Sequence, residues 1–272
     1  MYLKTTIVTT FLYHVPLTHH VEKIDKKRLF GVQTASEYDN ATSKYVFRPL
    51  SRIFSLILLR TPVTPNQITI FWGLLMIASA ALLFTGDRIL CVLGGLGWIV
   101  AYALDYSDGD IARYKDMKSV RGRFQDRVNH RTTYPILMFG AGFGAWISGR
   151  TELFGIAIDP AAYLILGFTA GLGMILIIDL GANYNNCCPD KALDRDKGTA
   201  AVEGKHFKNQ RLFRILMILN PLVFTNMMLL IPVFAILDLM DIFVLFYGVM
   251  YPLAAFARYI LLYRMVPGVV KK

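Results

Sequence analysis

The sequence predicts an all-α polytopic membrane protein with six transmembrane helices, preceded by an amphipathic helix on the membrane surface. Of its 272 residues, 55% are hydrophobic, and the mean hydropathy is +0.45. Apolar runs of about 17–25 residues recur along the chain, which is the length that a helix needs to cross a bilayer. Because backbone polar groups must be paired within lipid, these runs are expected to be helical.

The predicted elements follow one another without an internal repeat. Residues 1–45 form an N-terminal cytoplasmic extension, and residues 46–61 form the interfacial amphipathic helix, in which RPLSRIFSLILLR has helical periodicity. Residues 62–266 form the transmembrane domain, and residues 267–272 form a cytoplasmic tail. The six spans are expected at about 66–85, 89–112, 132–148, 161–182, 212–236 and 242–264.

The first span has a clear start in the sequence TPVTPNQIT. The hydroxyl of Thr64 can cap the helix, and Pro65 suits the first helical turn, where no backbone N–H is needed. The sequence therefore predicts a helix that begins at Pro65.

The distribution of basic residues predicts the orientation in the membrane. The chain has 29 Lys and Arg against 19 Asp and Glu, and its short loops on one side contain only Arg88 and Arg150 of these basic residues. By the positive-inside rule, both termini and the segments 113–131 and 183–211 are cytoplasmic, in an inner or cytoplasmic membrane. The net charge of +10 is then a topology signal that also favours anionic membrane lipid, and no nucleic-acid partner is expected.

The second span ends in a group of ionisable residues, which are costly in a membrane and are usually functional. Asp105 and Asp108 are three residues apart and share one face of a helix. Gly109 and Ala112 continue that face with little bulk, so a pyrophosphate or ribose could approach the backbone there. Arg113 lies where it could reach a phosphate.

A second stripe is expected at the start of the third span, where Gly122, Asp126 and His130 are spaced four residues apart. If the two helices bring their stripes together, three carboxylates and an imidazole meet. Carboxylates in one buried site repel each other unless a cation is bound, and Mg²⁺ or Mn²⁺ suits oxygen ligands of this kind. For any single acid the alternative is a solvated helix end, but the complete set indicates phosphoryl-type transfer assisted by one or two ions.

The spacing of these residues resembles the signature of the CDP-alcohol phosphotransferase family, D-x2-D-G-x2-A-R-x8-G-x3-D-x3-D. The sequence PNQIT, with Pro65, Asn66 and Thr69, is also similar to that family, as are the surface helix and the six spans. The resemblance covers about residues 48–266. The signature is matched at Asp105, Asp108, Gly109, Ala112, Arg113, Gly122 and Asp126.

The resemblance implies an enzyme of phospholipid or phosphodiester biosynthesis. Such enzymes move a substituted phosphate group from a CDP-linked donor, here expected to be CDP-diacylglycerol, to an alcohol acceptor and release CMP. It also implies a homodimer and a site open to the cytoplasmic leaflet. The implied metal ligands are Asp105, Asp108 and Asp126, and the residues implied to lie around the donor are Asn66, Thr69, Gly109, Ala112, Arg113 and Gly122.

The sequence departs from the signature at its last position, where His130 replaces Asp. In one interpretation His130 is the general base, since an imidazole suits this task near neutral pH. In another, His130 is a metal ligand and favours Mn²⁺ over Mg²⁺. In the third, the site has lost its base. Asp110 and Asp116 are expected to point away from both stripes, so neither can substitute.

The acceptor site is less defined. Arg211, Arg214 and Arg258 could bind a phosphorylated acceptor, although basic residues at these positions also anchor helices at the membrane surface. Asp179 and Asn183 could hydrogen-bond a polyol. Two other functions remain open: a catalytically impaired homologue that binds CDP-lipid, and a small membrane transporter, which would instead spread polar residues at mid-membrane depth over several helices.

Overall fold

The computed structural model describes residues 24–33, 41–149, 151–153, 156–188 and 220–266. Their helices and strands are, in order, α2 (Lys26–Val32), the π-helical turn η2 (Ser43–Phe47), α3 (Arg48–Leu58), α4 (Pro65–Leu83), α5 (Arg88–Tyr114), α6 (Val120–Ser148), β1 (Glu152–Leu153), β2 (Ile156–Ala157), α7 (Ala161–Cys187), α10 (Phe224–Ile236) and α11 (Met240–Met265). The strands form one short antiparallel pair. The prediction of a helical protein is confirmed.

The helices α4, α5, α6, α7, α10 and α11 follow the six predicted spans in order. Four of them, α4, α5, α7 and α11, are long and apolar enough to cross a membrane. These four helices indicate an integral membrane protein. The helix α10 has 13 residues, and the first part of its predicted span, 212–219, lies outside the described residues.

The helix α6 begins at Val120, twelve residues before the apolar span expected at about 132–148, so it includes the predicted stripe of Gly122, Asp126 and His130. Ser119 caps it, since its hydroxyl accepts a hydrogen bond of 2.9 Å from the backbone N–H of Gly122. One helix of 29 residues therefore joins a charged first half to an apolar second half. Hydropathy detects only the second half, whereas the helical spacing of Gly122, Asp126 and His130 indicates the first half.

The start of α4 is confirmed. Thr64 and Gln67 form a reciprocal capping box, and Pro65 occupies the first turn. The backbone N–H of Thr64 donates to the side chain of Gln67 at 2.9 Å. This cap satisfies backbone groups that a helix leaves unpaired at its N-terminus.

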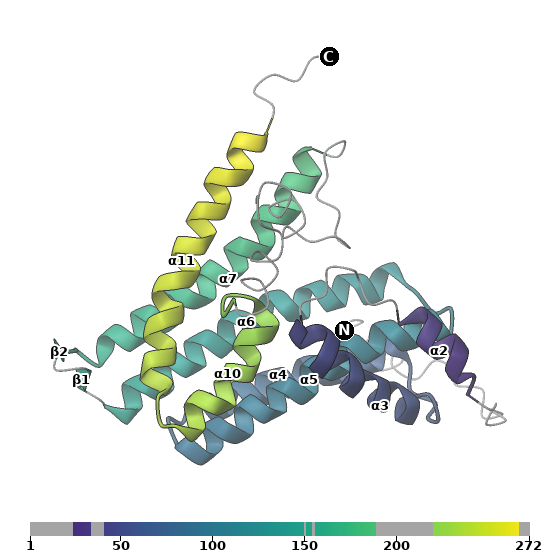
Figure 1. The fold of residues 1–272 in the computed structure, drawn as a ribbon, viewed down its shortest axis with the longest axis horizontal. Coiled ribbons are helices and arrows are strands. Elements are labelled where there is room, and N and C mark those ends of the chain that lie inside the picture. The colour runs from purple at the N-terminus through teal and green to yellow at the C-terminus, as the bar shows by residue number, and fades with distance from the viewer. Residues whose placement is uncertain (1–23, 34–40, 150, 154–155, 189–219, 267–272) are drawn as a thin grey trace, which may run out of the picture.

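The helices pack as a chain of neighbours (Figure 1). The helix α4 contacts both α5 and α6, α6 contacts α7, and α7 contacts α11, while α10 packs on α5. The turn between α4 and α5 meets α6 backbone to backbone: a Cβ added at Gly144 would lie 2.1 Å from the carbonyl oxygen of Leu83. This close approach fixes α6 against the C-terminal end of α4.

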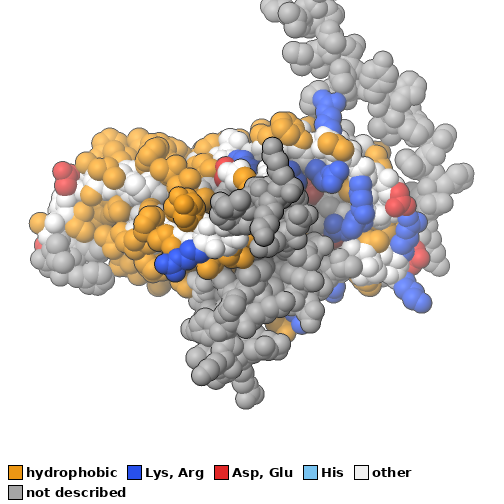
Figure 2. All heavy atoms as spheres, turned by 90° about the horizontal axis from the view of Figure 1, so that it is seen from above, with side chains coloured by type: hydrophobic (Ala, Val, Ile, Leu, Met, Phe, Trp, Pro, Cys, Tyr) orange, Lys and Arg blue, Asp and Glu red, His pale blue; other side chains and the backbone are white. Residues whose placement is uncertain are grey.

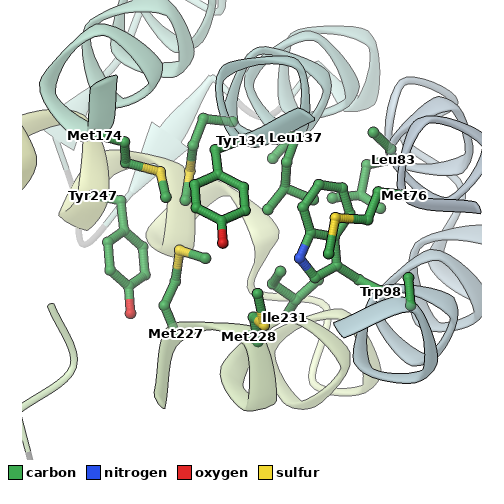
Figure 3. Close-up of a cluster of buried hydrophobic side chains, with 14 of the residues drawn as sticks. Met76, Leu83, Trp98, Tyr134, Leu137, Met174, Met227, Met228, Ile231 and Tyr247 are labelled. Carbon is green, nitrogen blue, oxygen red and sulfur yellow. The ribbon is translucent and has the colours of Figure 1, made fainter. Parts of the chain in front are cut away.

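The buried core lies between α4, α5, α6, α7, α10 and α11 (Figure 3). Its labelled side chains are Met76, Leu83, Trp98, Tyr134, Leu137, Met174, Met227, Met228, Ile231 and Tyr247. Large apolar side chains on the outer faces of the long helices stay exposed, among them Phe71, Ile165 and Phe256. In Figure 2, hydrophobic side chains cover one part of the surface, and most visible Lys and Arg gather toward the end where α2 and α3 lie. This division is expected for helices that contact lipid along part of their length.

The helix α3 corresponds to most of the predicted interfacial helix. Ser51 and Ser55 are buried, whereas Ile53 and Ile57 are each 55% exposed. Ser51 and Ser55 therefore face the protein, where Leu50 and Phe54 also pack against the core, while Ile53 and Ile57 point outward. A helix at a membrane surface is expected to have such outward apolar side chains, because lipid can contact them.

Candidate functional site

Two carboxylates and an imidazole meet where α5 and α6 pack against the end of α4. The Nε2 atom of His130 lies 3.2 Å from a carboxylate oxygen of Asp126 and 3.5 Å from one of Asp105. Ligand atoms of the three residues lie within 4.8 Å of one another. We call these three residues the acid–histidine cluster. The two predicted stripes are thus brought together at Asp105, Asp126 and His130.

The early start of α6 is what builds this cluster. Because the helix is regular from Val120, Asp126 and His130 lie four residues apart on one face, one turn above the other. Asp105 reaches them from α5, nine residues before that helix ends at Tyr114. Had the helix begun near residue 132, the second stripe would have been loop.

Asp108 lies beside the cluster and is held by α4. One of its carboxylate oxygens accepts hydrogen bonds from Thr69 Oγ1 at 2.7 Å and from Trp72 Nε1 at 2.8 Å. The expectation that Thr69 lies near the site agrees with this contact. Trp72 was missed, although its position one helical turn after Thr69 was a signal that could have identified it.

His130 lies between two aromatic rings. Its ring centroid is 5.1 Å from that of Trp72 and 5.0 Å from that of Tyr134. Its Nε2 faces the two carboxylates, whereas its Nδ1 is buried and has no hydrogen-bond partner among the described residues. The imidazole is therefore oriented by packing on its faces and by acids at one edge only.

The glycines of the signature lie at close approaches. A Cβ added at Gly122 would be 2.7 Å from Asn66 Oδ1, so this glycine and the predicted Asn66 lie in contact. A Cβ at Gly109 would be 3.3 Å from the Nη1 atom of Arg113. The structure thus places Asn66 against Gly122 and the guanidinium of Arg113 against Gly109. Ala112, on the same stripe as Gly109, is partly buried.

Arg113 does not point at the acid–histidine cluster. Its Nη2 donates to Asp110 at 2.6 Å, and its Nε donates to the carbonyl oxygen of Val32 at 3.0 Å. Asp110 and Asp116 lie away from the stripes, as expected: Asp110 is completely buried, and Asp116 pairs with Arg28 at 2.9 Å. Asp110 also accepts hydrogen bonds from Gln33 and Ser51, and no local sequence pattern predicts these contacts.

The residues considered for an acceptor form a separate group. Asp179 accepts from Arg131 at 2.7 Å, and a Cβ at Gly181 would be 2.8 Å from a guanidinium nitrogen of Arg258. Asn183 is exposed. Arg211 and Arg214 lie outside the described residues. Arg131, the neighbour of His130 in sequence, was not identified beforehand.

The donor atoms of the acid–histidine cluster fit a divalent cation. Two carboxylates and one imidazole nitrogen come from two helices, and their ligand atoms lie within 4.8 Å of one another, close enough to bind the same ion. Carboxylate oxygens suit Mg²⁺ and Mn²⁺, and the imidazole makes Mn²⁺ the better match. The second oxygen of Asp108 is a further donor beside this set.

Comparison with known families points to one kind of chemistry. The family model described as CDP-alcohol phosphatidyltransferase matches residues 62–184. This range includes α4, α5, α6 and nearly all of α7, and with them every residue of the acid–histidine cluster. A search among curated proteins gives no match for the chain.

Proposed function

Since this chain belongs to the CDP-alcohol phosphatidyltransferase family, we propose that it transfers a substituted phosphate group from a CDP-linked donor to an alcohol and releases CMP. CDP-diacylglycerol is the proposed donor, and the product is a phosphodiester lipid or polyol. The observation that carries the proposal is the acid–histidine cluster, because it is the group of three possible metal ligands found among the described residues.

The first part of the proposal is that Asp105, Asp126 and His130 hold one divalent cation, with Asp108 as a ligand beside them. Such a cation would neutralise negative charge that develops on the diphosphate as CMP leaves. One Asp of the family signature is replaced by His130, which lowers the negative charge of the site by one. A second ion is therefore proposed to bind more weakly than the first.

The donor is proposed to lie along the glycines of the stripes. Gly109 and Gly122 lack side chains, so a diphosphate or ribose can approach the backbone between Arg113 and Asn66. Arg113 is 35% exposed at its side chain, which leaves part of the guanidinium able to meet a phosphate oxygen. Thr69 on α4 and Ala112 on α5 complete the proposed binding surface for the donor.

In the transfer step, the hydroxyl oxygen of the acceptor attacks the phosphorus that bears the lipid alcohol. A new P–O bond forms, the bond from that phosphorus to the bridging oxygen breaks, and CMP leaves with the bridging oxygen. As the alternative to the ligand role of His130, we propose that Asp105, Asp108 and Asp126 hold the cation and that the hydroxyl proton passes to Nε2 of His130, because a metal-bound nitrogen cannot accept a proton. Asp105 and Asp126, at 3.5 and 3.2 Å, would stabilise the imidazolium that forms.

A second candidate is a catalytically impaired homologue that binds a CDP-lipid. The geometry of His130 favours it in one respect, because an Nε2 atom shared between two carboxylates is stabilised when it carries a proton. A histidine that already holds its proton cannot accept another at that atom. The two candidates therefore share the donor site and differ in turnover.

We further propose that α4, α5, α6, α7, α10 and α11 each cross the membrane, with α2 and α3 on the cytoplasmic surface and the site open to the cytoplasmic leaflet. The proposal also places the transmembrane domain at residues 62–266. It includes the homodimer that the family resemblance implies. The basic side chains toward the end with α2 and α3 in Figure 2 support the sidedness.

The test is to measure CMP release from CDP-diacylglycerol by the purified full-length protein with Mn²⁺ or Mg²⁺ and a panel of alcohols. Release should vanish in Asp105→Asn and Asp126→Asn and should persist or rise in His130→Asp. Metal-dependent binding of CDP without release in the wild type would favour the impaired homologue. A wild-type protein that binds no CDP with either metal would overturn both candidates.

A further inference from the structure

Arg113 is held by a part of the chain that lies outside the residues matched by the family model. Its Nε donates to the carbonyl oxygen of Val32, at the end of α2, and its Nη2 donates to Asp110. The same guanidinium lies against Gly109. The guanidinium of Arg113 therefore contacts Val32, Asp110 and Gly109, and its two hydrogen bonds to Val32 and Asp110 set its orientation.

Asp110 is the centre of this arrangement. Its side chain is 0% exposed, and an unpaired buried carboxylate would cost several kcal/mol. One oxygen accepts from Gln33 Nε2 at 2.8 Å and from Ser51 Oγ at 2.9 Å, and the other faces Arg113 Nη2 at 2.6 Å. The carboxylate thus connects the motif helix α5 with α3 and with the residue that follows α2.

Gln33 cannot rotate freely in this network. Its amide nitrogen donates to Asp110, and its amide oxygen accepts from Arg52 Nε at 2.9 Å. The side chain is 5% exposed, and reversing the amide would break both contacts. Gln33 therefore fixes the position of the carboxylate that, in turn, pairs with Arg113.

The helix α2 is secured on the same end of α5 by contacts that do not involve Arg113 (Figure 1). Arg28 pairs with Asp116 at 2.9 Å, and the backbone N–H of Asp25 donates to Tyr114 at 3.1 Å. The side chains of Arg28 and Asp116 are 51% and 82% exposed, so this pair contributes little. This exposed ion pair therefore serves as a control for the buried hydrogen bond between Gln33 and Asp110.

We propose that Gln33 and Asp110 are positioning residues of the donor site, which hold the Arg113 guanidinium against Gly109 in line for a donor phosphate. The inference rests on the proposed function, since it assigns the donor phosphate to Arg113. It gives the end of the N-terminal extension a role that the family match does not include: Gln33 sets affinity for the CDP donor through Asp110 and Arg113, without touching the donor itself.

The experiment uses the full-length protein in detergent with Mn²⁺. Gln33→Met keeps the length of the side chain and removes both hydrogen bonds, and Gln33→Ala is a second variant. The expected result is that KM for CDP-diacylglycerol and Kd for CDP, measured by calorimetry, rise about five- to tenfold. The KM for the alcohol and the melting temperature should stay close to the wild-type values. The matched control, Arg28→Gln, should change none of these.

A double variant separates positioning from general loosening. In an Arg113→Ala background, Gln33→Met should add little to the loss of donor affinity, because its effect passes through the missing guanidinium. Full additivity of the two changes would overturn the inference. So would an unchanged donor KM in both Gln33 variants, or a rise of both KM values together with a lower melting temperature. If the wild type binds no CDP, the proposed function itself fails, whereas normal wild-type turnover with unaffected Gln33 variants refutes only this inference.

Discussion

The indole nitrogen of Trp72 donates a hydrogen bond of 2.8 Å to a carboxylate oxygen of Asp108. Trp72 is completely buried, and its ring also packs against that of His130. One side chain of α4 therefore fixes two residues of the proposed metal site, which come from α5 and α6. Residues that orient metal ligands commonly affect metal affinity as well as activity.

Trp72→Phe should weaken Mn²⁺ binding about tenfold, because it keeps an aromatic ring in the core but removes the N–H that orients Asp108. Calorimetry or the paramagnetic resonance of free Mn²⁺ would measure the change without turnover. Trp98→Phe is the matched control, since Trp98 is also buried and its N–H has no partner among the described residues. Equal metal affinity in the Trp72 variant and the wild type would contradict this role.

The choice of ion tests the ligand role of His130. Chelation should abolish CMP release, and Mn²⁺ should restore it at a lower concentration than Mg²⁺, because an imidazole nitrogen is a better ligand for Mn²⁺. In His130→Asp the preference should shift toward Mg²⁺, which favours an all-oxygen site. The measurement is the metal concentration at half-maximal rate for each ion. An unchanged ratio in His130→Asp would show that His130 does not bind the metal.

Gly122→Ala should impair donor binding. The new methyl group would lie 2.7 Å from Asn66 Oδ1, so the Asn66 side chain must move out of its place beside the stripe. The expected result is a rise of about tenfold or less in donor KM, with kcat reduced less strongly. Because the obstructing atom is at the end of a side chain, Asn66→Ser should make room and partly restore the KM of Gly122→Ala. No restoration would mean that the methyl group acts through Ser119 Oγ, which would lie 3.0 Å from it, or on the donor directly, and not through Asn66.

Gly144→Ala should destabilise the fold rather than change the chemistry. Its Cβ would lie 2.1 Å from the carbonyl oxygen of Leu83, and backbone cannot move aside as a side chain can. We expect a loss of about 1–3 kcal/mol, seen as a lower melting temperature in detergent. Gly31→Ala is the control, because a Cβ there would have no neighbour within 4 Å. A melting temperature equal to that of the wild type would show that α4 and α6 can separate at this contact.

Much of the site follows from helical periodicity. Residues three or four apart share a face, so the pairs Asp105 with Asp108 and Asp126 with His130 were placed correctly relative to each other. Local capping chemistry likewise predicted the start of α4 at Pro65. These features depend on residues within one turn of each other, which is the range over which a sequence pattern is informative.

The direction of Arg113 could not be predicted in this way. Its expected target was a phosphate, but in the structure it pairs with Asp110, and one further partner of Asp110, Gln33, lies 77 residues away in sequence. Periodicity places a side chain on a face of its helix but does not say which distant segment covers that face. The contacts of Trp72 with Asp108 and His130 have the same origin, since three different helices contribute to them.

The sequence by itself determined that the chain is a helical membrane protein with two stripes of acids and small residues, because hydrophobic length and helical spacing are local properties. Only the tertiary structure decided that the stripe on α6 meets the stripe on α5, so that His130 lies between Asp105 and Asp126. It also decided that α2 reaches the motif helix through Gln33 and Val32. These relationships depend on packing between elements far apart in the chain, where many small contacts together select one arrangement.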